Sequence, residues 1–187
     1  MGWTWRELRP DDSWRVTVRR PVQMAEIGAL IYLYQPIIGP EAVSLYVTLS
    51  MRGEFPAVGE SPPHTHRMLM GLLSLPLDRI AEARHRLEAV GLLKSFKREE
   101  PLGNAFRYEL HPPLRPDNFF NTDVLSITLL NRLGKEGFRQ VRERFLTLKE
   151  NAQTQRDEEE VTKKFYEVFT SITPSELTVR DREAQQL

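Results

Sequence analysis

The chain has 187 residues, which is enough for one well-packed domain with appended helices. Its 26 basic and 26 acidic residues cancel, so it lacks the overall positive field that drives nonspecific nucleic-acid binding. It contains no cysteine, which excludes disulfides and thiolate metal sites, and no apolar run reaches the roughly 20 residues needed to span a bilayer. We therefore expect a soluble, cytoplasmic protein.

The N-terminal arm, residues 1–23, is rich in tryptophan and arginine. No apolar run follows a basic start here, so no secretion signal is recognisable. Residues 14–18 alternate between apolar and polar side chains, which predicts a short β-strand. We expect the arm either to cover the core of its own domain or to reach a neighbouring chain.

Two helices are expected after the arm. Residues 24–34 form an apolar helix that Pro36 ends, and a second helix begins at Pro40. Gly39 and Pro40 mark the end of the first helix and the start of the second, because glycine favours a helix end and proline favours the first helical position. Residues 52–64 hold two glycines and three prolines, so we expect a surface loop there.

The most informative stretch begins at Thr65 and predicts two helices joined by a tight turn. The first helix has apolar residues at helical spacing, and Pro76 forces a turn after it. The second helix covers residues 78–90, and Gly91 follows where a left-handed C-cap is expected. This arrangement predicts a helix-turn-helix.

Two strands are expected next, over residues 92–98 and 105–110. The polar residues 99–104 between them have the composition of an exposed loop. A helix-turn-helix with such a hairpin is a winged helix, which we place at residues 24–111. The fold class is therefore mainly α with a small β-wing (α+β), a winged helix-turn-helix with additional N- and C-terminal helices.

A C-terminal helical extension, residues 112–172, is expected to pack on the winged helix. After a rigid connection rich in proline, a cap at Asn121 or Thr122 begins a helix that ends at Gly134. The apolar residues of this helix surround much of its circumference, which predicts burial on more than one side. They are Val124, Leu125, Ile127, Leu129, Leu130 and Leu133.

Two further helices, residues 135–150 and 157–172, each carry one apolar stripe. The remaining residues, 173–187, are polar and charged without a clear apolar face. We expect them to form a flexible tail that leads to a second domain absent from this sequence.

Cations of the second predicted helix and of the wing are candidates for DNA contact, because they suit phosphate oxygens. These candidates are Arg79, Arg86, Lys94, Lys97, Arg98 and Arg107. Acids interleave with them and would repel phosphate: Asp78, Glu82, Glu88, Glu99 and Glu100. A mixed-charge surface that faces solvent or protein is therefore favoured over strong reading of duplex DNA.

Aromatic residues in the flanks exceed what a minimal winged helix needs for its core. Aromatics are enriched in protein interfaces, so these residues are candidates for self-association. They are Trp3, Trp5, Trp14, Phe138, Phe145, Phe165 and Phe169. The alternative is that they pack inside the chain.

Metal binding and catalysis find little support. His64 and His66 are separated by one residue, but no further ligands follow at convincing spacing, so an ordinary loop is favoured over a metal site. The sequence has no GxxxxGK[ST] phosphate loop, no GxSxG elbow and no HExxH helix. We expect a protein that is not an enzyme and has no cofactor.

Four segments carry a resemblance to a known family. They are LYQPIIGPEAVSLYVTL at 33–49, LPLDRIAEARHRLEAVGLLKSF at 75–96, YELHPPLRPDNFFNTDVLSITLLNRLGKEGF at 108–138 and FYEVF at 165–169. In these runs the chain resembles the N-terminal domain of the DnaB/DnaD family of Gram-positive bacterial primosome proteins. The resemblance covers roughly residues 10–178.

The resemblance implies an accessory factor that helps load the replicative helicase at the origin and at restart sites. It implies partners such as DnaD, the loader DnaI and the helicase itself, and self-association into dimers or tetramers. The family's second domain carries a Tyr-x-x-x-Ile-x-x-x-Trp pattern associated with single-stranded DNA, but no tryptophan follows Trp14 here.

DNA binding by this part of the family is therefore expected to be weak or to act through that absent domain. We expect localisation in the cytoplasm at the nucleoid, and we expect any membrane association to act through another part or partner, since no basic amphipathic helix is evident. The alternative function is that of a winged-helix transcription regulator that binds duplex DNA.

Overall fold

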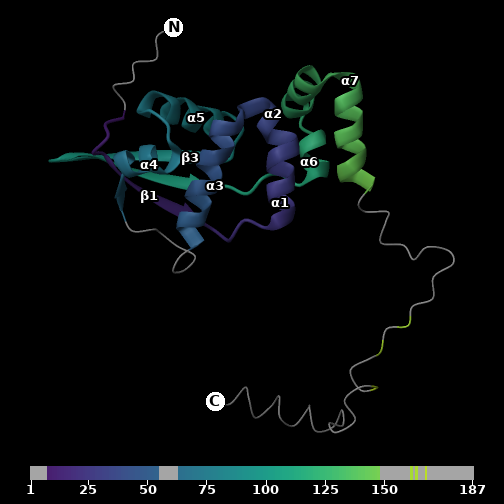
Figure 1. Ribbon diagram of the computed structural model, residues 1–187, viewed down its shortest axis with the longest axis horizontal. Helices are drawn as coiled ribbons and strands as arrows, with labels where there is room; N and C mark the ends of the chain where they lie inside the picture. The colour runs from purple at the N-terminus through teal and green to yellow at the C-terminus, as the bar shows by residue number, and fades with distance from the viewer. Residues whose placement is uncertain (1–7, 55–62, 148–160, 162, 164–166, 168–187) are drawn as a thin grey trace. The chain divides into compact units, whose positions relative to one another are not determined.

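Figure 1 shows a computed structural model of the chain, which describes residues 8–54, 63–147, 161, 163 and 167. The chain divides into two units, residues 1–147 and residues 148–187. All helices and strands given below belong to the first unit. Most of the predicted helix at 157–172 lies outside the described residues, as do Trp3, Trp5, Phe165 and Phe169.

A four-stranded sheet in the order β2-β1-β4-β3 forms one layer of the fold. The strands are β1 (Ser13–Val18), β2 (His64–Thr65), β3 (Leu93–Glu100) and β4 (Gly103–Leu110). Strand β1 lies parallel to β4, with Trp14 opposite Phe106, whereas β3 and β4 form an antiparallel hairpin. The short β2 pairs antiparallel with β1 and closes the other edge.

The inner face of the sheet supplies much of the core. Trp14, Val16 and Val18 alternate with more exposed residues along β1 and are buried, as the alternation of the sequence predicts. On β4 the buried positions are Phe106, Tyr108 and Leu110. Residues 13–18 of the expected arm form β1, an inner strand of the sheet, so this part of the arm covers the core of its own domain.

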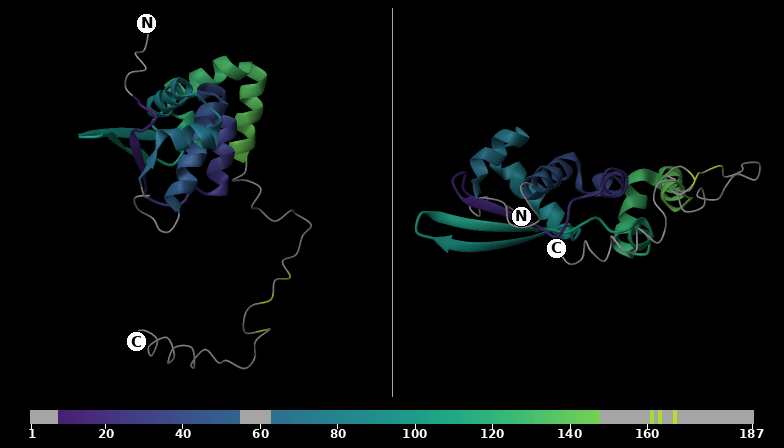
Figure 2. Two further views of the ribbon diagram at one scale, coloured as in Figure 1. Left: turned by 60° about the vertical axis from the view of Figure 1, so that its left-hand side comes forward. Right: turned by 90° about the horizontal axis from the view of Figure 1, so that it is seen from below.

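The helices lie on one side of the sheet and beside it (Figure 2). The elements are α1 (Met24–Ala29), the π-helical turn η2 (Leu30–Tyr34), α2 (Gln35–Ile38), α3 (Pro40–Glu54), α4 (His66–Leu73), α5 (Leu77–Ala89), α6 (Pro116–Phe120) and α7 (Asp123–Thr147). Helix α3 contacts both β1 and β4, and α5 contacts β3. Helices α6 and α7 pack on each other, and α7 also packs on η2 and α2.

The prediction that Pro36 ends the first helix is wrong. The chain passes from α1 through η2 into α2, and the backbone N–H of Gln35 donates to Leu30 five residues earlier. A proline lacks the N–H and clashes with the carbonyl of a regular α-helix, and the wider π turn before it accommodates the ring. The helix ends at Gly39, where φ is 85°.

The helix-turn-helix is confirmed. The Thr65 side chain accepts a hydrogen bond from the Met68 N–H and caps α4, which ends at Ser74 in a left-handed conformation. Pro76 is the N-cap residue of α5, and Gly91 follows with φ of 77°. The turn at Pro76 and the helix end at Gly91 each depend on a few neighbouring residues, which explains why the sequence alone predicts them.

The hairpin is longer than predicted. Residues 99–104 are not a loop, because Glu99 pairs with Asn104 and Glu100 with Gly103. Only Pro101 and Leu102 form the turn at the wing tip. Backbone pairing across a short turn outweighs the polar composition from which the loop was inferred.

The described part of the C-terminal extension departs from expectation at two points. Pro116 begins the short helix α6 instead of forming part of a rigid connection. Helix α7 is buried along one side only, so Leu125 and Leu129 are buried but Val124 is 75% exposed and Ile127 57% exposed. The break at Gly134 is confirmed, with φ of 70° and ψ of 173°. Among the described residues, no helix is long and apolar enough to cross a membrane.

Candidate nucleic-acid interface

Two of the candidate cations lie on α5, where both make ion pairs inside the chain. The guanidinium of Arg79 lies 2.8 Å from the carboxylate of Glu41 at the start of α3. Arg86 lies 2.6 Å from Glu82 and also donates to the backbone carbonyl of Ile38 at 3.2 Å. Hydrogen bonding to Glu41 raises the pKa of Arg79 above its ordinary value.

These contacts bind α5 to the last residue of α2 and the first turn of α3. The carboxylates of Glu41 and Glu82 balance the two arginines, so this surface has no excess of positive charge. A winged helix that reads duplex DNA places cations of its second helix on phosphates and base edges. Here the same cations hold two parts of the chain together.

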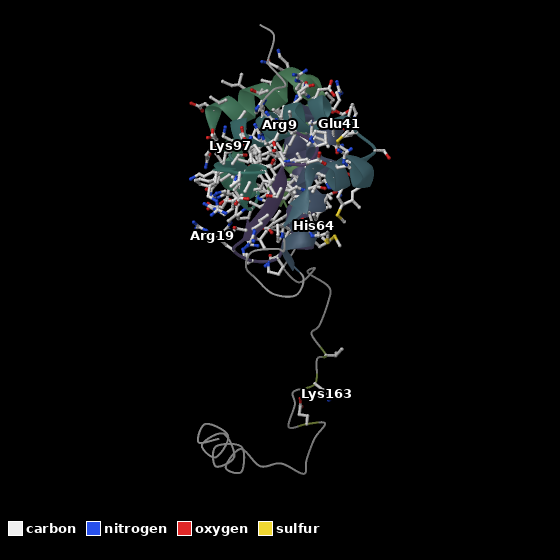
Figure 3. The ribbon with its side chains drawn as sticks, turned by 90° about the vertical axis from the view of Figure 1, so that its left-hand side faces the viewer. Arg9, Arg19, Glu41, His64, Lys97 and Lys163 are labelled. Atoms are coloured by element: carbon white, nitrogen blue, oxygen red, sulfur yellow. The ribbon has the colours of Figure 1, made fainter. Side chains whose placement is uncertain are left out.

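The remaining candidates lie on the wing. Lys94, Lys97 and Arg98 are exposed, and Arg98 is 2.5 Å from Glu100. The guanidinium of Arg107 lies over the ring of Phe96, 4.0 Å from its centroid, and 3.3 Å from the carboxylate of Glu109. In Figure 3, Lys97 and Arg19 lie on one side of the molecule and Glu41 on the other. The wing and the α3–α5 surface are therefore separate.

The sheet brings Arg15, which the sequence analysis missed, beside the wing cations. The register places Arg15 opposite Arg107, and Arg107 opposite Phe96. The alternation of residues 14–18 already puts Arg15 on the face opposite Trp14. The pairing of β1 with β4 joins residues far apart in the chain, and no local signal reveals it.

An open groove of about 740 Å³ runs along this side of the sheet. We call the surface that it follows the outer sheet face, and define it by side chains that alternate with the buried ones. Its members are Arg15 on β1, Lys94, Phe96, Arg98 and Glu100 on β3, and Arg107 and Glu109 on β4.

The histidine pair of the sequence analysis has a structural place. His66 is completely buried, with Nδ1 2.7 Å from the Asp12 carbonyl and Nε2 2.7 Å from the Tyr108 hydroxyl. Burial lowers the pKa of His66 below its ordinary value. Among the described residues, no group of three or more His, Asp or Glu side chains is arranged to hold a metal ion.

The candidates for self-association that the structure describes contribute to the chain's own packing. Trp14 is 1% exposed and donates from Nε1 to the Thr65 carbonyl at 2.9 Å. This corrects its assignment to an interface, because its side chain lies in the core. Phe138 is half-buried against Phe120, with ring centroids 5.7 Å apart.

Phe145 is likewise half-buried, 6.0 Å from the ring of Tyr32. Some of the exposed apolar side chains lie on α1, η2 and the first turns of α7, and others lie on α3, α4 and the wing. Those of the first group are Met24, Ile31, Tyr32, Val124 and Ile127. The sequence analysis missed Met24, Ile31 and Tyr32 as surface residues, and it placed Val124 and Ile127 in the core.

The chain is similar to proteins of bacterial DNA replication. It is 31% identical over 167 residues to a Staphylococcus aureus protein named replicative helicase loading/DNA remodeling protein DnaB. The match covers 87% of this chain and 34% of that protein, so the chain spans about a third of its relative.

A solved structure shares the fold as well. It is a crystal structure of primosome protein DnaB from Geobacillus stearothermophilus, residues 1–300, with 34% identity and a TM-score of 0.68. The match covers 85% of this chain and 59% of that one. A family model described as the DnaB N-terminal winged helix domain matches residues 8–186, and the chain belongs to this family.

Proposed function

We propose that this chain is the assembly domain of a non-enzymatic accessory protein that helps load the replicative helicase when DNA replication is initiated or restarted. Membership of the DnaB N-terminal winged helix family supports this role. The relatives are named as a helicase loading protein and a primosome protein, which supports it further.

The use of α5 is the observation that favours assembly over transcriptional regulation. A regulator needs the cations of its second helix for DNA. In this chain Arg79 binds Glu41 through two hydrogen bonds, of 3.0 and 2.9 Å, and Arg86 bonds to the Ile38 carbonyl. The alternative function, a winged-helix regulator of duplex DNA, would need these contacts to break.

Self-association into dimers or tetramers is part of the proposal. Met24 is 84% exposed, and Val124 and Ile127 are also mainly exposed, so apolar surface is available on two elements. Burial of such side chains between copies would be favourable. The partners that we propose are DnaD, the loader DnaI and the replicative helicase, with localisation at the nucleoid.

A mass measurement in solution tests the assembly. We expect the wild-type chain to be larger than a monomer by light scattering, and a variant with Val124→Asp and Ile127→Asp to have a lower mass. Asn131→Asp changes an exposed polar residue of the same helix and is the matched control. A strict monomer at all concentrations would remove the oligomeric scaffold.

Helicase loading is tested in a reconstituted reaction with DnaD, DnaI and the helicase. The amount of helicase placed on single-stranded DNA should fall with the Val124→Asp and Ile127→Asp variant and stay unchanged with Asn131→Asp. Sequence-selective, salt-sensitive duplex binding that Arg79→Glu and Arg86→Glu abolish would instead establish the regulator.

A further inference from the structure

We infer that the outer sheet face is a binding surface for single-stranded nucleic acid, with Arg107 and Phe96 as a stacking platform and Arg15 and Arg98 as phosphate contacts. This goes beyond the proposed function, which needs only assembly and helicase loading. It also moves the DNA contact from α5, where the sequence analysis placed part of it, to the sheet.

The register of three neighbouring strands creates the surface. Arg15, Arg107 and Phe96 form one row across β1, β4 and β3. In the next row, Ala105 lies between Ser13 and Arg98. Since side chains alternate along each strand, these rows share one face, while Trp14, Phe106 and Tyr108 occupy the other. Helices α3 and α5 pack on the inner face, and no helix of the described residues covers the outer face (Figure 2).

The local charge suits a nucleic-acid backbone although the net charge of the chain is zero. The cations of the outer sheet face are Arg15, Lys94, Arg98 and Arg107, and its acids are Glu100 and Glu109. The cations therefore exceed the acids here, in contrast to the balanced α3–α5 surface. The pairs Arg98–Glu100 and Arg107–Glu109 join residues two apart on one strand and hold no elements together. The Arg98–Glu100 pair is exposed and the Arg107–Glu109 pair is partly exposed, and ion pairs in contact with water are weak, so phosphate can compete for these arginines.

The ring of Phe96 and the guanidinium of Arg107 favour binding of single-stranded over double-stranded nucleic acid. Phe96 is 43% exposed, and the guanidinium of Arg107 lies 4.0 Å from its ring centroid. Unpaired bases stack on aromatic rings and guanidinium planes, whereas the bases of a duplex are already stacked on one another. The groove that passes these two residues also contacts Arg15 and Arg98, so phosphates beside a stacked base meet positive charge.

Fluorescence anisotropy with a labelled oligothymidylate of about 20 nucleotides tests the inference. We expect binding at about 50 mM salt that weakens steeply towards about 200 mM. The variant Arg15→Gln with Arg98→Gln should bind about tenfold more weakly, and its salt dependence should be shallower by about 0.7 for each phosphate that the variant no longer neutralises. A duplex of the same length should bind more weakly than the single strand.

The aromatic contribution is tested separately. Phe96→Ala should weaken binding by about fivefold to a hundredfold, whereas Phe96→Trp keeps a stacking surface and should restore it. The matched control is Arg132→Gln, which removes one exposed charge from α7, an element that contacts α6, α2 and η2. The control variant and the variant Arg79→Gln with Arg86→Gln should both bind like the wild type.

Several results would overturn the inference. They are no binding of the wild type at low salt, equal binding by the outer-face variants, tighter binding of the duplex, and equally effective competition by a polyglutamate peptide. Melting temperatures close to that of the wild type show that the Arg15→Gln and Arg98→Gln changes leave the fold intact. The helicase-loading reaction measures the proposed function independently of oligonucleotide binding. A failure of the proposed function is therefore distinguishable from a failure of this inference.

Discussion

The Nε2 atom of His66 accepts a hydrogen bond from the Tyr108 hydroxyl at 2.7 Å. Its Nδ1 atom donates to the backbone carbonyl of Asp12, also at 2.7 Å, and burial disfavours the charged ring by lowering its pKa, so the neutral ring carries its proton on Nδ1. His66 begins α4, Tyr108 lies on β4, and Asp12 precedes β1. This buried histidine therefore connects the helix-turn-helix to the sheet.

Stability should decrease at mildly acidic pH because of His66. Burial lowers its pKa in the folded chain, whereas the unfolded chain takes up a proton near pH 6.5. Below about pH 6.5 the unfolded state binds more protons than the folded state, so the free energy of unfolding falls as the pH falls towards the folded pKa. Above about pH 6.5 the ring of His66 is neutral in both the folded and the unfolded chain, so this loss of stability is absent.

Urea unfolding at about pH 7.5, 6.5 and 5.5 measures how the free energy of unfolding depends on pH. In a His66→Gln variant the unfolding free energy should be lower overall but should change less over the same range. An unchanged pH dependence in the variant would show that other groups are responsible.

The Tyr108→Phe variant tests the hydrogen bond itself. It keeps the ring but removes the donor to His66, which leaves a buried acceptor without its partner. The expected loss is about 1 to 3 kcal/mol in the free energy of unfolding. Tyr32→Phe removes a hydroxyl from a partly exposed ring and is the control, with little expected change. Equal losses in the two variants would contradict the assigned role.

Local signals in the sequence predict much of the helix-turn-helix but not the environment of His66. Pro76, Gly91 and the apolar spacing act within a few residues of the turns that they define. The burial of His66 depends on Asp12 and Tyr108, whose positions follow from the pairing of β1 with β4. A histidine in a loop rich in proline gives no sign of that pairing.

The candidate interface divides in the same way. Exposed wing cations such as Lys97 and Arg98 follow from the hairpin pattern, which is local. The ion pair of Arg79 with Glu41 depends on how α5 packs on α3, and the approach of Arg15 to Arg107 depends on strand order. These distant contacts decide which cations are available to a ligand.

Two glycines should respond in opposite directions to alanine. Gly39 has φ of 85°, and an added Cβ would lie 3.2 Å from the Arg86 guanidinium. Gly39→Ala should therefore destabilise the chain by about 1 to 3 kcal/mol. Gly71 lies within α4 with open space around it, so Gly71→Ala should stabilise the chain by about 0.5 to 1 kcal/mol.

Thermal unfolding of the two glycine variants provides the measurement. The melting temperature should fall with Gly39→Ala and rise with Gly71→Ala. A Gly39→Ala variant as stable as the wild type would mean that the turn between α2 and α3 does not need a positive φ.

Arg84 should contribute more to stability than arginines on the surface. It is buried on α5, with Nε 3.3 Å from the Glu88 carboxylate and its guanidinium 5.7 Å from the centroid of the Phe106 ring. Arg84→Ala removes the buried stem and leaves Glu88 without this partner. Because Glu88 is partly exposed, water compensates for some of the loss, and about 2 kcal/mol is expected instead of the value for a fully buried pair.

Arg84→Met separates the two contributions, because it keeps the apolar stem and removes the charge. Since Glu88 also accepts a hydrogen bond from the Ser95 hydroxyl, its carboxylate retains one partner and the loss should be about half that of alanine. Arg139→Ala on α7 removes an exposed arginine that pairs with Glu136, and chemical denaturation should detect no clear change. If Arg84→Met is as unstable as Arg84→Ala, the charge and not the stem dominates, and the cation over Phe106 joins α5 to the sheet.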